Sequence, residues 1–104
     1  MTNMELVHRF TGLLFQKLYP VHPQRLSFTL NAIDQDADAT TLSLYRDAML
    51  YLRDSGLINF QAYANTDPPY FENVVLTDNG VDWWTATTDE PEKRQIGFRL
   101  PHGS

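Results

Sequence analysis

One glycine, Gly56, divides the middle of this chain into a helical pattern and a β pattern, and this arrangement constrains the fold most. Over residues 40–55, apolar residues recur at three- and four-residue spacing, which predicts an amphipathic helix. Gly56 suits the position just past a helix end, where the backbone turns left-handed. Two β-prone runs, 57–65 and 70–76, then flank the turn sequence TDPP. The sequence therefore predicts a long helix followed at once by a hairpin.

The long helix has one face that the spacing assigns to the core. The expected members of this face are Thr41, Leu44, Tyr45, Ala48, Tyr51 and Leu52, with Leu42 and Met49 at its edge. The outward arc carries Ser43, Arg46, Asp47, Leu50, Arg53 and Asp54. Leu50 is an apolar residue in the middle of this polar arc. It is either one of the scattered surface apolar residues of any protein or the centre of a partner site, and the sequence leaves both open.

The elements before this helix are a first helix, a short strand and an acidic loop. Residues 2–18 place apolar side chains on one broad stripe, which predicts a helix that Pro20 ends. Residues 26–30 alternate apolar and polar side chains, which predicts either a short strand or the start of a turn. The loop 31–39 holds Asp34, Asp36 and Asp38, and we interpret it as a solvated segment in which Asp38 or Thr40 caps the long helix.

After the hairpin, the sequence predicts one more short helix. Thr77 is its expected N-cap, and Val81, Trp83 and Trp84 supply the surface that docks it. Adjacent helical positions point about 100° apart, so one tryptophan is expected in the core and the other closer to solvent. We assign residues 1–86 to one domain and residues 87–104 to a C-terminal extension with strand-like alternation at 95–100.

Composition and charge exclude several classes of function. The chain has 104 residues, no cysteine and a formal net charge of -5, and residues 1–88 hold 10 acidic and 5 basic side chains. Such an acidic body disfavours nucleic acid, whose binding depends on neutralised phosphates. No apolar run is long enough to cross a membrane and no signal peptide is evident, so we expect a cytoplasmic protein, which the lack of cysteine fits.

No pattern in the sequence indicates catalysis or metal binding. The three acidic residues of the loop imitate the start of an EF-hand, but Ala39 replaces the required glycine and Tyr45 the closing glutamate. The histidines have no partner at ligand spacing, and no nucleophile elbow or phosphate loop occurs. We therefore expect no catalytic residues, no cofactor and no metal.

The order of helix, short strand, helix, hairpin and short helix resembles the winged-helix superfamily. The sequence YLRDSGLI at 51–58 looks like the end of a winged-helix third helix entering the first wing strand. The sequence LTDNG at 76–80 looks like the step that closes the wing. The chain is also similar to small bacterial winged-helix proteins of unassigned function, through the Pro-rich link at 19–23 and the acidic residues at 34–38. The resemblance implies an α+β winged-helix fold over residues 1–85.

The resemblance also implies a DNA-binding third helix, and here the chain departs from the family. The residues that would read DNA are Ser43, Arg46, Leu50 and Arg53. Two cations on the arc are matched by Asp47 and Asp54, and the wing contributes Asp67 and Glu72 without a lysine or arginine. The fold is expected to be kept while the DNA-binding chemistry is largely lost.

Three hypotheses about function follow, in order of preference. The first is a non-enzymatic protein-interaction module, with a protein partner or a second copy of the chain as its ligand. Its contact surface would comprise Leu50, Arg46, Asp47, Arg53, Asp54, Trp83 and Trp84. The second is a DNA-binding transcriptional regulator. The third is an acidic inhibitor of the phage or plasmid type, whose surface mimics nucleic acid.

Overall fold

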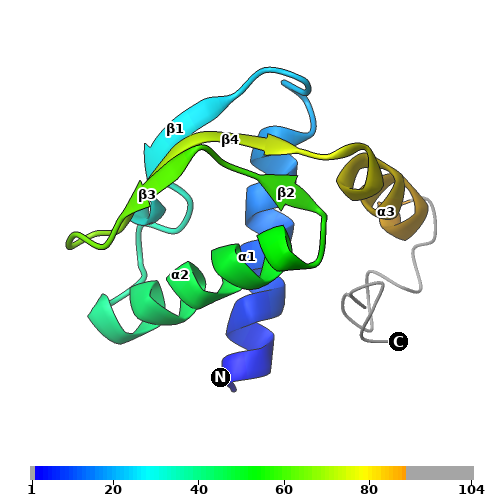
Figure 1. Cartoon of the computed structure of the whole chain (residues 1–104). Helices are drawn as coiled ribbons and strands as arrows, with labels where there is room; N and C mark the ends of the chain where they lie inside the picture. Colours follow the sequence, from blue (N-terminus) through cyan, green and yellow to red (C-terminus); the bar gives the residue numbers. More distant parts are fainter. Residues whose placement is uncertain (1, 89–104) are drawn as a thin grey trace.

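The computed structural model of the chain describes residues 2–88, which form an α+β fold (Figure 1). Helices and strands follow in the order α1 (Asn3–Leu18), β1 (Leu26–Thr29), the 3-10 turn η1 (Leu30–Ala32), α2 (Ala39–Asp54), β2 (Ile58–Asn59), β3 (Ala62–Ala64), β4 (Tyr70–Leu76) and α3 (Asp78–Thr88). The expected order of elements is confirmed, although α3 runs past the expected domain end at residue 86. The strand expected at 95–100 lies outside the described residues.

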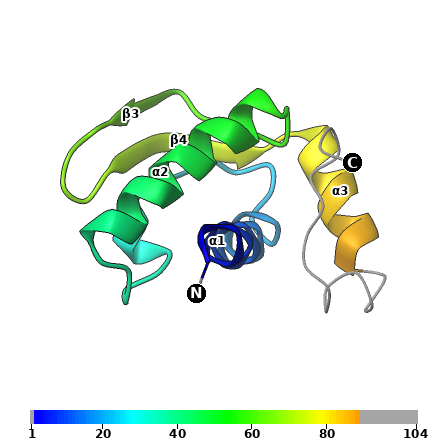
Figure 2. The same cartoon turned by 90° about the horizontal axis from the view of Figure 1, so that it is seen from below.

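The sheet is antiparallel and is built around β4. Strand β1 pairs with one edge of β4, while β2 and β3 pair with the other edge. Helices α1 and α2 cross each other beside the sheet, and α3 follows β4 at the far end (Figures 1 and 2). This arrangement, three helices with a small antiparallel sheet, is compatible with a winged-helix-like fold.

The helix ends are fixed by the residues expected to cap them. The Asp38 carboxylate accepts a hydrogen bond from the Thr41 backbone N–H at 2.8 Å, so Asp38 rather than Thr40 caps α2. Gly56 has a φ of 79°, the left-handed conformation that a helix C-terminus favours. The Thr77 hydroxyl accepts from the Gly80 backbone N–H at 3.0 Å and begins α3.

The buried face of α2 differs from the expected one. Its buried residues are Leu42, Tyr45, Ala48, Met49 and Leu52, whereas Tyr51 is 39% exposed and Leu44 is half-buried. The expected phase is wrong because the apolar pattern of this helix covers more than half of its circumference. Tyr45 is common to both faces and its ring stacks on the Phe10 ring of α1 at 4.5 Å, while Leu42 and Met49 take the core positions expected for Leu44 and Tyr51.

The first arm of the hairpin is broken into two short strands. The expected continuous run over 57–65 becomes β2 and β3, with Phe60 and Gln61 between them. Phe60 turns its ring inward and meets the Phe71 ring edge-on at 5.0 Å. On the other side of β4, Asn73 has a φ of 56° at an irregularity in the pairing with β1.

Candidate interaction face on α2 and the hairpin

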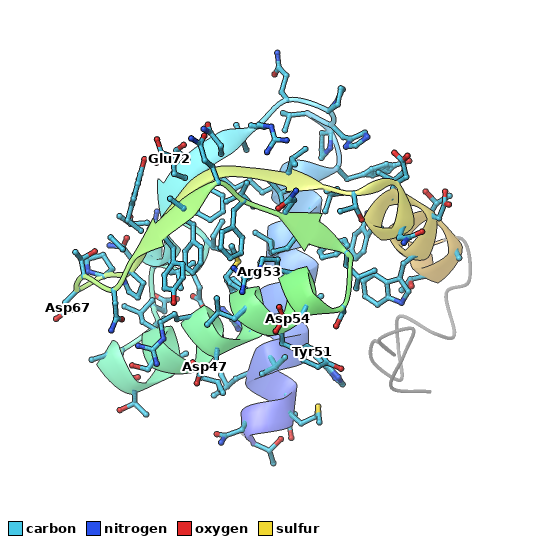
Figure 3. All side chains as sticks on the ribbon, viewed as in Figure 1. Asp47, Tyr51, Arg53, Asp54, Asp67 and Glu72 are labelled. Atoms are coloured by element: carbon cyan, nitrogen blue, oxygen red, sulfur yellow. The ribbon has the colours of Figure 1, made fainter. Side chains whose placement is uncertain are left out.

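Five residues of α2 form the candidate site, which we call the α2 face: Arg46, Asp47, Leu50, Arg53 and Asp54. They are spaced by three, four and seven residues, so they share one side of the helix. This side lies away from the buried residues of α2 and borders the hairpin (Figure 3). The structure thus brings together the α2 part of the predicted contact surface.

Arg46 is held by its neighbours. Its Nε and Nη2 atoms donate to the Asp47 carboxylate at 3.3 and 3.2 Å, and its Nη1 atom donates to the Asn65 side-chain oxygen at 2.8 Å. These contacts join α2 to the end of the hairpin and leave the side chain only 27% exposed. The guanidinium is therefore already supplied with acceptors.

Arg53, about two turns further along α2, also contacts neighbouring protein groups. Its Nε lies 3.5 Å from the Asp54 carboxylate, and its guanidinium carbon lies 5.0 Å from the centre of the Phe60 ring. Both arginines of the α2 face therefore lean toward the hairpin, where they contact protein groups.

The carboxylates of the α2 face are more exposed than its arginines, although Arg53 is itself 42% exposed. The Asp47 and Asp54 side chains are 64% and 72% exposed. Figure 3 shows them on α2, with Asp67 at the tip of the hairpin and Glu72 on β4. On the α2 face itself two carboxylates stand against two arginines, and the carboxylates are the more exposed groups.

Leu50 is not the fully exposed residue that its place in the polar arc suggests. It is half-buried and packs against the hydrophobic core. Ser43, which lies on the same side of α2 about two turns before Leu50, is exposed. Leu50 therefore contributes both to the fold and to the surface between the arginines and the carboxylates.

The two tryptophans lie apart from the α2 face. Trp84 is buried at 8% exposure and Trp83 is half-buried, as the helical geometry predicts. Their rings lie 5.5 and 5.2 Å from the Phe15 ring and dock α3 on α1. Helix α3 sits at the opposite end of the molecule from the hairpin (Figure 1). The structure does not join Leu50 and the tryptophans into one surface.

Asp34 is the residue whose setting was missed, since it was expected in a solvated loop and is buried. Its carboxylate accepts from the Tyr45 hydroxyl at 2.8 Å and lies 3.4 Å from Arg9 Nε. Burial raises the pKa of Asp34, but the hydrogen bonds from Tyr45 and the Asp36 backbone N–H, together with the Arg9 charge, lower it below the ordinary 3.8. A signal was present, because a tyrosine on a buried helix face needs a partner for its hydroxyl.

A shallow hollow of about 220 Å³ lies beside this buried pair and is lined by Leu6, Arg9, Asp34, Asp36, Ala37, Thr41 and Tyr45. Arg9 and Asp34 already face each other across its floor, so their charges are matched within the chain. Within residues 2–88, no three His, Asp or Glu side chains are grouped so as to hold a metal ion. No helix of the described part is long and apolar enough to span a membrane.

Comparisons with known proteins identify no relative of this chain, so its function is inferred from the arrangement of its residues. No protein-family model matches the chain. No curated protein and no solved structure matches it significantly.

Proposed function

We propose that this chain is a non-enzymatic winged-helix domain whose α2 face binds protein rather than DNA. Helix α2 stands in the position of the third helix and the β3–β4 hairpin in that of the wing. The sheet order, with β4 between β1 and the β2–β3 arm, supports this assignment. The proposal includes a cytoplasmic location, which the absence of cysteine fits.

One observation carries the proposal: on the α2 face each arginine lies beside a carboxylate that is more exposed than the arginine itself. A DNA-reading helix needs free guanidinium groups for base edges and phosphates. Here Arg46 and Arg53 are each paired with a neighbouring aspartate, so a phosphate that approached either guanidinium would also meet Asp47 or Asp54. The exposed Asp47 and Asp54 would then repel the phosphate backbone.

The same features suit a protein contact. Leu50 offers a half-buried apolar centre, and the charged residues around it form a polar rim. A rim of this kind excludes water from a contact and fixes its register, whichever protein lies opposite. The wing borders the rim through Asn65 and Phe60, so α2 and the wing would act as one surface.

Titration of fluorescein-labelled mixed-sequence duplex DNA with the protein tests the choice between DNA and protein. At about 50 mM salt, where non-specific binding is strongest, we expect no rise in anisotropy up to tens of micromolar protein. Binding that weakens steeply by about 200 mM salt, and that is lost in the Arg46→Ala, Arg53→Ala double variant, would contradict the proposal and support a transcriptional regulator.

A capture experiment tests the protein-binding half. The wild-type chain and an Asp47→Arg, Asp54→Arg variant serve as baits in parallel. The matched control is Asp36→Arg with Asp82→Arg, which makes the same charge change at exposed positions outside the α2 face. We expect a partner that binds the wild-type and the control but not the α2 variant. Equal capture by all three baits would place the contact elsewhere.

A further inference from the structure

We propose that the α2 face is a homodimer interface, in which two copies of the chain pack their α2 helices in parallel about a two-fold axis. This inference rests on the proposed function, in which the α2 face contacts protein, and it identifies the partner as a second copy of this chain. It is argued from the order of charges along the helix.

The charges of the α2 face form two rows of opposite sign. Arg46 and Arg53 form one row on the hairpin side, where they contact Asn65 and Phe60. Asp47 and Asp54 form the other row, 64% and 72% exposed. Seven residues make almost two full turns, so the two members of a row point the same way and lie about 10 Å apart along the axis. Leu50 lies between the rows.

Symmetry decides which pairing of two such faces is favourable. A two-fold axis parallel to the helices sets the arginine row of each copy against the aspartate row of the other, at the same height along the axis. A two-fold axis perpendicular to the helices sets like rows against each other, arginine to arginine and aspartate to aspartate. The charge pattern therefore favours parallel packing and opposes antiparallel packing, as flanking charges do in coiled coils.

The exchange of partners that such a dimer requires costs little. The present ion pairs join sequence neighbours, with separations of 3.2 and 3.5 Å, and both aspartates are exposed. Exposed pairs of this kind contribute about 0–1 kcal/mol to stability, so they give way readily to contacts between copies. The α2 face holds two positive and two negative charges, so the net charge of -5 of the whole chain does not oppose contact at this place. Leu50 would lose its remaining exposure.

A charge-exchange experiment tests the interface. One variant carries Arg46→Glu with Arg53→Glu, and the other carries Asp47→Arg with Asp54→Arg. By sedimentation equilibrium we expect the wild-type at about 24 kDa, twice the 12.0 kDa of the chain, and each variant alone as a monomer. An equimolar mixture of the two variants should restore the mass of a dimer, because opposite rows face each other again. Circular dichroism of each variant checks that it is folded.

A single cysteine tests the orientation, since the chain has none of its own. Ser43 is exposed and lies seven residues before Leu50, on the same side of α2. In the parallel pair the two copies of Ser43 lie at the same height, so Ser43→Cys should form a disulfide-linked dimer under mild oxidation. In an antiparallel pair centred on Leu50 they would lie about 20 Å apart. Gln16→Cys, at an exposed position of α1, is the control and should not become cross-linked by a disulfide.

Each failure has a separate meaning. A wild-type monomer at about 200 µM, or a dimer that survives in both charge variants, overturns the homodimer. Cross-linking no faster at Ser43→Cys than at Gln16→Cys overturns the parallel packing. None of these results bears on the DNA titration or the capture experiment, which test the proposed function separately.

Discussion

Asp34 links three segments of the chain through one buried carboxylate. It lies between α1 and α2, where it accepts from Tyr45 and faces Arg9. Burial of a charge is unfavourable unless it is paired and hydrogen-bonded, and here both conditions are met. Between β1 and α2 the chain forms only one short 3-10 turn, η1. The contacts of Asp34 with Tyr45 and Arg9 therefore help to fix α1 and α2 relative to each other. Asp34 is therefore a stability residue of the fold.

We expect the Asp34–Tyr45 pair to make the free energy of unfolding depend on pH in both the acid and the alkaline range. The lowered pKa of Asp34 means that its contribution is present at neutral pH and is lost as pH falls below about 3.8. Burial and the neighbouring Asp34 raise the pKa of Tyr45 to about 12, so the Tyr45 contribution is present below pH 10 and is lost as pH rises toward 12.

Chemical denaturation between pH 3 and pH 11 measures this dependence. Tyr45→Phe should lower the free energy of unfolding at pH 7 by about 1–3 kcal/mol, because Asp34 stays buried with one donor fewer. The variant should also lose the alkaline decline. Tyr51→Phe removes a hydroxyl from an exposed tyrosine of the same helix and is the control. A pH profile of Tyr45→Phe that matches the wild-type would contradict the assigned role.

Gly80 is needed for a close approach between α3 and the turn after α2. A Cβ at this position would lie 2.0 Å from the Leu57 carbonyl oxygen, a backbone atom that cannot move alone. We expect Gly80→Ala to lower the free energy of unfolding by about 3 kcal/mol, at the upper end of overpacking effects. Gly56→Ala meets nothing within 4 Å but has a φ of +79°, so it should cost about 1–2 kcal/mol. Thermal unfolding of the two variants tests this order.

At the scale of elements, α2 carries both the core and the α2 face, and Leu50 belongs partly to each. Because Leu50 packs against the core, Leu50→Asp should lower the free energy of unfolding by about 1–2 kcal/mol. Ser43→Asp, at an exposed position near the start of the same helix, should change it by less than about 0.5 kcal/mol. Urea denaturation distinguishes the two, and equal stability would mean that Leu50 is a surface residue.

The sequence predicts elements better than their rotation. Gly56, Asp38 and Thr77 act locally, so their roles in ending and capping helices follow from residue type and position alone. The buried face of α2 depends instead on where α1 crosses it, which no local pattern contains. The α2 face was predictable as a set of residues, but its two arginines could not be assigned to the hairpin until Asn65 and Phe60 were placed beside them.

At the scale of the whole molecule, the charged side chains are distributed unevenly, and positive and negative groups point in different directions. Arginines on α2 turn inward to the hairpin, while carboxylates from α2, the hairpin tip and β4 turn outward (Figure 3). The charges on α2 therefore differ from those that a DNA-binding helix needs, whatever the order of helices and strands suggests. Function in this chain is therefore read from the contacts of Arg46 and Arg53, not from the order of helices and strands.

The central position of β4 has a consequence for how the protein is made. Every strand pairing in the described part involves β4, which begins only at Tyr70. A nascent chain that has left the ribosome as far as Pro69 holds α1 and α2 but has no strand to pair with β1, β2 or β3. No part of this sheet can therefore form before β4 has emerged, whereas the contact between α1 and α2 needs only residues that precede it.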